Sequence, residues 1–216
     1  MKYFIVGPGR TGSYRIFDLL SQHFFTQDIE QTSYSLTTPD GLGQINLGNR
    51  GVGNLLPPLE ETKSFDEIRE FLGSCKDNTV IHSHAILAPP DLENWTIIYS
   101  TRKSKAELIM SRLIARHIGN WKPVDKDIKF TPFEAKRDDA QLLQILNFEY
   151  NVKKTFPNHV EIRMEDDCQQ IMEKLKITFD KHLIDSQDTR YISNHRYPDL
   201  ITNYLDVFKW CGEEHA

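Results

Sequence analysis

The amino-acid sequence predicts an α/β protein with a central parallel β-sheet that is covered by helices on both faces. Short apolar runs typical of buried strands alternate with segments of helical periodicity. Two S-x-x-E sequences, which cap helix N-termini, begin at Ser64 and Ser104. No repeat, low-complexity tract or linker divides the chain, so we expect one domain over residues 1–216.

The N-terminal part is predicted to contain a strand, a helix, a long irregular region and a second helix. Residues 2–6 (KYFIV) form the first buried strand, and a helix follows over about 12–24. Residues 26–63 are rich in Gly, Asn, Thr and Pro and are predicted to be long loops with short strands at most. The cap at Ser64 opens a helix to about Cys75.

The remaining elements continue the alternation. Strands are predicted at 78–84, 94–101 and 159–163, with helices from Ser104 to about His117, over 135–154, over 167–175 and, as one or two, over 198–211. Residues 120–134 are expected to be irregular. Trp95, Phe148 and Phe156 are assigned to the core, and the acidic run Glu165–Asp167 is expected to cap the helix that follows it.

The composition limits the function classes. The chain has 39% hydrophobic and 26% charged residues, a net charge of −5 and a pI of about 5.9. This balance argues against a general nucleic-acid binder but leaves room for a local basic patch. Its three cysteines include no CxxC pair, so neither a disulfide framework nor a zinc knuckle is indicated. No apolar segment approaches the ~20 residues of a membrane span, and the first apolar run is too short for a signal peptide. We therefore expect a soluble, cytoplasmic protein with no membrane partner.

The turn after the first strand has the spacing of a phosphate-binding loop. Gly7 and Gly12 form a G-x-x-x-x-G pattern between a strand and a helix, where backbone amides and the helix dipole favour an anion. Arg10 adds a positive charge and Ser13 a hydroxyl donor. Ser13 stands where ATPases and GTPases need Lys, and the later strands end without a magnesium-binding Asp. The simple alternative is a tight turn that binds nothing.

Two later strand ends carry further candidate residues. His82 and His84 end the strand over 78–84, at the edge of a parallel sheet where ligands bind, so a general base or half of a metal site is conceivable there. Arg102 ends the next strand, and Ser111 lies in the helix after it, where both can reach a second anion. The structural alternatives are a loop histidine without chemistry and a solvated basic helix start.

Five segments in order resemble the P-loop sulfotransferases. PGRTGSY resembles their 5′-phosphosulfate loop, VIHSHAIL their Lys-Thr-His segment, and IIYSTRKSKAELIMSRL their 3′-phosphate segment. VEIRMEDD and YPDLITNYLDVFKW are similar to the family's later strand-and-turn and C-terminal stretches, so the resemblance covers about residues 3–210. It implies a three-layer α/β/α, P-loop NTPase-like fold. It also implies 3′-phosphoadenosine 5′-phosphosulfate (PAPS) as sulfuryl donor, with no metal.

The resemblance assigns roles to individual residues. The 5′-phosphosulfate would be held by the loop residues Gly9, Arg10, Thr11, Gly12, Ser13 and Tyr14. Arg10 would stabilise charge on the bridging oxygen, and His84 would be the catalytic base. Arg102 and Ser111 would bind the 3′-phosphate. His82 stands where many members have Lys, and the usual C-terminal Arg-Lys-Gly clamp is replaced by candidates in 190–196, chiefly Arg196 with His195, and more weakly Arg190.

The expected reaction is sulfuryl transfer to a hydroxyl or amine of a carbohydrate or other small-molecule acceptor.

The sequence departs from the family at Tyr14 and Arg15, and it lacks the usual Asp-Pro after Arg102. The alternatives are therefore a catalytically inactive nucleotide-binding protein, a P-loop kinase relative, and an interaction module that kept only the fold. Arg15 is expected either to contact the donor or to face solvent.

Overall fold

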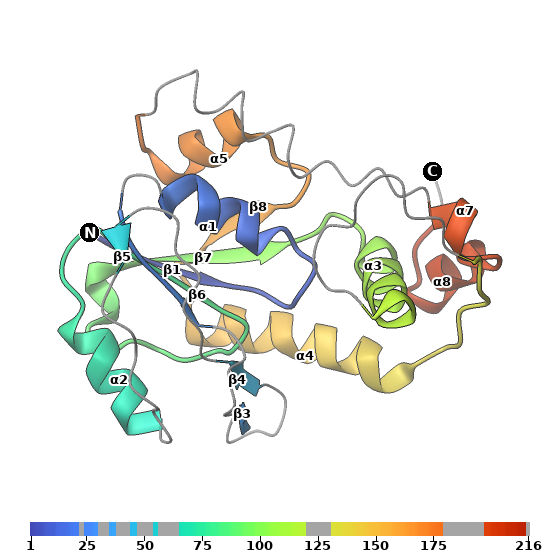
Figure 1. Cartoon of the computed structure of the whole chain (residues 1–216), viewed down its shortest axis with the longest axis horizontal. Helices are drawn as coiled ribbons and strands as arrows, with labels where there is room; N and C mark the ends of the chain where they lie inside the picture. The colour runs from blue at the N-terminus through green and yellow to red at the C-terminus, as the bar shows by residue number, and fades with distance from the viewer. Residues whose placement is uncertain are drawn as a thin grey trace.

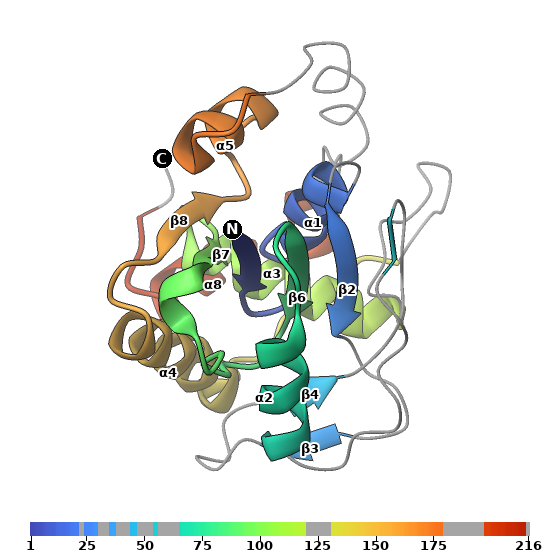
Figure 2. The same cartoon turned by 90° about the vertical axis from the view of Figure 1, so that its left-hand side faces the viewer.

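Six strands form one parallel sheet at the centre of the computed structural model (Figures 1 and 2). The structure describes residues 1–21, 24–29, 35–37, 44–46, 54–55, 65–119, 131–178 and 197–214. Every pair in this sheet is parallel. Across the sheet, the strands are β5 (Asn54–Leu55), β2 (Phe25–Ile29), β6 (Thr79–Ser83), β1 (Lys2–Val6), β7 (Trp95–Thr101) and β8 (Val160–Arg163). A separate antiparallel pair joins β3 (Ser35–Thr37) to β4 (Gln44–Asn46).

Helices cover both faces of this sheet, which confirms the predicted α/β class (Figure 1). One face carries α1 (Ser13–Ser21) and α5 (Cys168–Leu175), and the other carries α2 (Phe65–Ser74) and α4 (Asp139–Thr155). A third group packs together near the carboxyl ends of the strands: α3 (Lys105–Ile118), α7 (Tyr197–Leu200) and α8 (Tyr204–Trp210). A short 3₁₀ turn, η1 (Leu92–Asn94), leads into β7.

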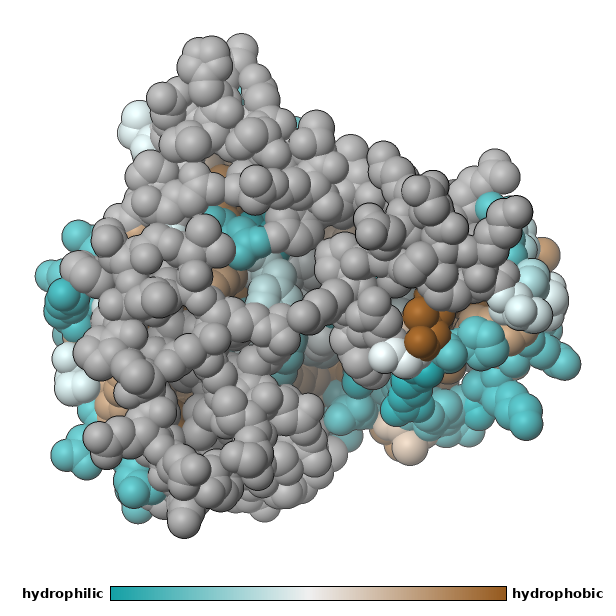
Figure 3. All heavy atoms as spheres, in the orientation of Figure 1, coloured by the Kyte–Doolittle hydropathy of each residue, from teal (hydrophilic) through white to brown (hydrophobic). Residues whose placement is uncertain are grey.

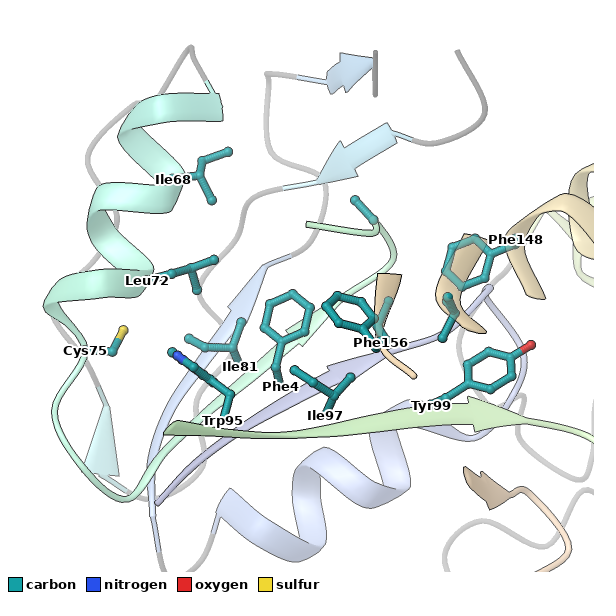
Figure 4. Close-up of a cluster of buried hydrophobic side chains, with 13 residues drawn as sticks. Phe4, Ile68, Leu72, Cys75, Ile81, Trp95, Ile97, Tyr99, Phe148 and Phe156 are labelled. Carbon is teal, nitrogen blue, oxygen red and sulfur yellow. The ribbon is translucent and has the colours of Figure 1, made fainter. Parts of the chain in front are cut away.

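Strand β1 is buried along its whole length, and its side chains alternate between two cores. Phe4 and Val6 belong to the cluster under α2 and α4, whereas Tyr3 and Ile5 belong to the cluster under α1 and α5. This alternation follows from the two-residue period of a strand that is covered on both faces. Figure 4 shows the first cluster, in which Trp95, Phe148 and Phe156 lie as predicted.

Most element boundaries agree with the sequence prediction, and β2 and the start of α4 are informative. Residues 25–29 form β2, a five-residue strand inside the sheet. Most of them fall in the region 26–63, which was predicted to be long loops with short strands at most. The sequence of β2, FTQDI, is largely polar, and its five-residue pairing with β6 is a long-range contact. Helix α4 begins at Asp139 rather than at 135, because the Asp138 carboxylate accepts a hydrogen bond from the Gln141 amide and so caps the helix there.

The predicted caps of two other helices are present. The Ser104 hydroxyl accepts from the Glu107 amide at the start of α3, and Gly119 ends that helix with a positive φ of 69°. Asp167 and Gln170 form a reciprocal capping box at the start of α5. Ser64, the other predicted cap, lies outside the described residues.

The C-terminal helices are held to the segment before α4 by backbone pairing. The Phe133 amide donates to the Leu200 carbonyl at 2.9 Å, and the Thr202 amide donates to the Phe133 carbonyl at 3.0 Å. The Asn203 side chain also accepts from the Ala135 amide and donates to the Ala135 carbonyl. These bonds fix the position of α7 relative to the segment before α4.

Helix α4 exposes Leu143, Leu146 and Tyr150, and the described atoms along the lower right edge of Figure 3 are mainly hydrophilic. Glu149 on this helix forms ion pairs with Lys153, one turn along α4, and with Lys105 of α3. Among the helices in the described ranges, none is long and apolar enough to cross a membrane.

Candidate functional site

The candidate site lies where the chain leaves the two central strands in opposite directions. After β1, the chain crosses toward β2 on one side of the sheet, whereas after β7 it continues toward β8 on the other side. Open α/β sheets bind ligands at such a point of divergence, outside the carboxyl ends of the strands. The loop over residues 7–12 follows β1, and Arg102 follows β7, so the predicted residues of both segments meet at this point.

The loop over residues 7–12 is shaped by close approaches and by left-handed backbone. A Cβ atom on Gly7 would lie 2.6 Å from the Ser100 carbonyl oxygen, so the loop passes directly against β7. Gly12 has a φ of 78°, and a Cβ there would press against Met164. Arg10 also has a φ of 78°, which is uncommon for a residue with a side chain. Strained backbone of this kind is concentrated at functional sites.

Hydrogen bonds hold the loop but leave several amides available. The Thr11 hydroxyl donates to the Pro8 carbonyl at 2.9 Å, so its side chain closes the turn, and the Ser100 hydroxyl donates to the Thr11 carbonyl. In contrast, the amides of Gly9, Thr11 and Gly12 donate to no acceptor within the part of the chain that the structure describes. Unpaired amides next to a helix N-terminus are suited to an anion.

Arg10 turns toward helix α3. Its Nε donates to the Ser111 hydroxyl at 3.1 Å, so two predicted residues that are 101 positions apart are in contact. Burial lowers the pKa of the Arg10 guanidinium, and the neighbouring Arg102 guanidinium lowers it further. The two arginines are therefore close enough to repel each other, an arrangement that an anion between them would relieve.

Arg102 is buried among neutral partners. Its side chain is 8% exposed, and its Nη1 donates to the Tyr197 hydroxyl at 2.6 Å and to the Glu107 carbonyl at 3.3 Å. Its Nη2 contacts the Met164 sulfur, and its Nε is buried without a partner. No carboxylate of the described residues forms an ion pair with it. A buried cation without a counter-charge is costly unless an anion binds there.

A second group of residues lies beneath the loop. His82 is fully buried on β6, and its Nε2 lies 2.9 Å from the Ser13 hydroxyl at the start of α1. The Tyr14 ring packs against the His82 ring, with 4.7 Å between centroids. His82 therefore orients the two residues that begin α1. The Tyr14 side chain is half-buried and packs on one side against His82.

His84 is held by the loop itself. Its Nδ1 lies 2.7 Å from the Gly7 carbonyl oxygen, and because a carbonyl only accepts, Nδ1 carries the proton. In the neutral ring the basic lone pair is then on Nε2. This geometry suits a general base beside the loop.

Arg15 does not face solvent. It is buried, and its Nη1 donates to the carbonyls of Met164 at 3.1 Å and Asp166 at 2.7 Å, so it fixes the turn between β8 and α5. That turn also bears Glu165, whose carboxylate accepts from the Lys103 amide at 3.1 Å. The turn thus supports the strand end that carries Arg102.

The structure brings together most of the residues that the sequence singled out. Arg10, Ser111 and Arg102 form one group; Ser13, Tyr14, His82 and His84 form a second group, which meets the loop at Gly7. Arg196, His195 and Arg190 lie outside the described residues. No group of three potential metal ligands gathers within the described ranges, and the two histidines instead contact Ser13 and Gly7.

Sequence reasoning missed two residues at the site, Tyr197 and Met164. Tyr197 lies 95 positions from Arg102, in a segment whose resemblance gave it no role. Met164 touches Arg102 and lies against Gly12. Its position directly after β8, at the carboxyl edge of the sheet, was the available signal.

Comparison with known proteins gives no relative. No family model, no curated protein and no solved structure matches the chain. The function must therefore be argued from the site.

Proposed function

We propose that the protein is a sulfotransferase that moves a sulfuryl group from PAPS to a hydroxyl or amine of a carbohydrate or other small-molecule acceptor. The observation that carries this proposal is the pair of neighbouring arginines, the half-buried Arg10 and the buried Arg102, at the carboxyl ends of β1 and β7. Two cations, a hydroxyl and a loop of unpaired amides suit a ligand with two separate anionic groups.

The strand order supports a P-loop NTPase-like, three-layer arrangement. Counted along the chain without the short β5, the strands lie in the order 2-3-1-4-5. This order differs from both the Rossmann order and the flavodoxin-like order. It puts the first strand in the centre of the sheet, with the glycine-rich loop at its carboxyl end.

The described residues fit the two ends of the donor. The loop amides and Ser13 would hold the 5′-phosphosulfate, and Arg102 with Ser111 would hold the 3′-phosphate. The buried Arg102 Nε, which has no partner, is the polar atom that such a phosphate would satisfy. Arg196 remains a proposed contributor from the C-terminal segment.

The proposed chemistry uses residues from the segments that follow β1 and β6. The donor supplies the sulfuryl group, and its leaving group is adenosine 3′,5′-bisphosphate. His84 would take the acceptor proton on Nε2 as the acceptor oxygen or nitrogen bonds to sulfur, while Nδ1 stays bonded to the Gly7 carbonyl. Arg10 would stabilise the electron pair left on the bridging oxygen, so positioning and fixed charge replace a metal ion.

The proposal is tested first by isothermal titration calorimetry with adenosine 3′,5′-bisphosphate in the absence of magnesium. We expect micromolar binding by the wild type and a loss of about 10- to 100-fold in Arg102→Ala, because hydrogen bonds to charged groups are the strong ones. A wild type that binds neither this nucleotide nor magnesium-ATP would contradict the proposal and favour an interaction module.

An acceptor screen with PAPS then separates an enzyme from a binding protein. We expect His84→Ala to bind the bisphosphate like the wild type but to transfer sulfuryl groups about 10²- to 10⁴-fold more slowly. Binding without transfer to any acceptor would favour the inactive nucleotide-binding protein. Binding that requires magnesium and a triphosphate would favour the kinase relative.

A further inference from the structure

The hydroxyl of Tyr197 lies directly on the proposed anion site. Helix α7 brings it to 2.6 Å from Arg102 Nη1, and the half-buried tyrosine is also near enough to Arg10 to influence it electrostatically. The pairing of residues 200–203 with 133–135 fixes this helix from its other end. The hydroxyl is therefore held at a defined position before any ligand arrives.

The direction of the hydrogen bonds shows what this hydroxyl can still do. A guanidinium only donates, so the Tyr197 oxygen accepts from Arg102 and keeps its own proton. None of the described residues accepts that proton. Ser111 has the same geometry, because its oxygen accepts from Arg10 Nε at 3.1 Å. In each of these two arginine–hydroxyl pairs, the hydroxyl proton can therefore still be donated to a ligand.

The state of Arg102 points independently to an anion. Its side chain is 8% exposed, its Nε has no partner, and its described contacts are a carbonyl, a hydroxyl and a sulfur. Buried polar atoms are nearly always satisfied, and a buried cation is normally paired with an anion. An anion on Arg102 would lie within reach of a hydroxyl that is already bonded to the same guanidinium.

We infer that Tyr197 donates a hydrogen bond to the phosphate that Arg102 binds and so selects nucleotides that carry a 3′-phosphate. This inference rests on the proposed function for the identity of the ligand. It gives the C-terminal segment a direct part in donor recognition. It also assigns to Tyr197 a binding role that the sequence resemblance did not supply.

The test compares Tyr197→Phe with Tyr150→Phe, the same change at an exposed position on α4. Each variant and the wild type are titrated calorimetrically with adenosine 3′,5′-bisphosphate and with adenosine 5′-monophosphate. We expect Tyr197→Phe to weaken bisphosphate binding about tenfold while monophosphate binding stays within about twofold. Tyr150→Phe should match the wild type for both nucleotides. Thermal unfolding of each variant checks that the retained ring preserves the fold.

The other outcomes are equally decisive. Unchanged bisphosphate binding, or an equal loss for both nucleotides, would overturn the inference. Tighter binding would also overturn it, because the hydroxyl would then be an occupant that the ligand has to displace. A wild type that binds neither nucleotide contradicts the proposed function instead. In that case the same proteins are titrated with inorganic sulfate, and equal binding by wild type and Tyr197→Phe, or none by either, overturns the role of Tyr197 at an anion site.

Discussion

Gly7 is the residue at which the candidate loop comes closest to the sheet. A Cβ atom there would lie 2.6 Å from a backbone oxygen of Ser100, which cannot move without disturbing β7. We expect Gly7→Ala to lower the free energy of unfolding by about 2 kcal/mol or more, because overpacking against backbone forces a shift. Chemical denaturation measures the change.

The matched control for this prediction is Gly9→Ala, two residues further along the same loop. A Cβ on Gly9 would meet no atom within 4 Å. This variant should unfold within about 0.5 kcal/mol of the wild type, as surface substitutions usually do. Equal destabilisation by both substitutions would show that the loop is sensitive to any side chain rather than to contact with β7.

At the scale of single elements, the N-terminus of helix α3 is held by a carboxylate that lies 108 positions later in the chain. Glu213 accepts from the Ser104 hydroxyl at 2.6 Å and from the amides of Lys105 at 2.8 Å and Ala106 at 3.3 Å. A negative charge at this position also interacts favourably with the helix dipole. The tail and α3 therefore stabilise one another.

We expect Glu213→Gln to lower the free energy of unfolding by about 1 kcal/mol, because the amide keeps the length of the side chain but loses the charge. The control is Glu214→Gln, an exposed neighbour, which should leave stability unchanged. Urea denaturation of both variants provides the measurement. Equal stability of the two variants would contradict a structural role for the Glu213 carboxylate.

Individual strands and helices differ in how well the sequence predicts them. Strands such as β1 and β7 are apolar over most of their length, and Asp167 and Gln170 form the capping box of α5. Local sequence patterns were therefore sufficient to predict these elements. The polar β2 has no such pattern, because its strand conformation depends on pairing with β6. The start of α4 was predicted four residues early, since apolar spacing does not reveal where the cap lies.

At the scale of the whole molecule, the predicted site residues came from strand ends, and the parallel sheet gathers strand ends at one edge. Arg10, His84 and Arg102 could therefore be expected near one another. The contact between Arg102 and Tyr197 spans 95 positions, and the contact between Glu213 and Lys105 spans 108. No local periodicity encodes contacts of this kind, which depend on how α7 and α8 pack against α3.

The reactivity of the three cysteines reports whether the core of the whole molecule is folded. Burial raises the pKa of Cys75 to about 12, whereas burial and Glu213 raise that of Cys211 to about 11. Cys168 is buried as well. We expect iodoacetamide at pH 8 to leave Cys75 and Cys168 unmodified in the native protein and to modify all three cysteines in urea, because only the exposed thiolate reacts.

Stability should also fall at high pH for the same reason. The native pKa of the Cys75 thiol lies above its ordinary value of 9.0. Above about pH 9 the thiol therefore ionises more readily in the unfolded chain, and the free energy of unfolding falls as the pH rises toward 12. Denaturation at pH 7 and pH 10 compares the wild type with Cys75→Ala. The wild type should lose more stability between the two pH values, and equal losses would contradict the raised pKa.

The central position of β1 has a consequence for how the protein is made. Its first five-residue strand pairs with β6 and β7, and the pairing of Lys2 with Trp95 joins residues 93 positions apart. During synthesis, β1 emerges before β6 and β7 and has no complete set of neighbours until β7 has been made. Folding of such a long-range sheet is slow, and the apolar KYFIV segment stays exposed meanwhile. An apolar strand that waits for its neighbours is prone to aggregate, so the nascent chain is most vulnerable until β7 leaves the exit tunnel.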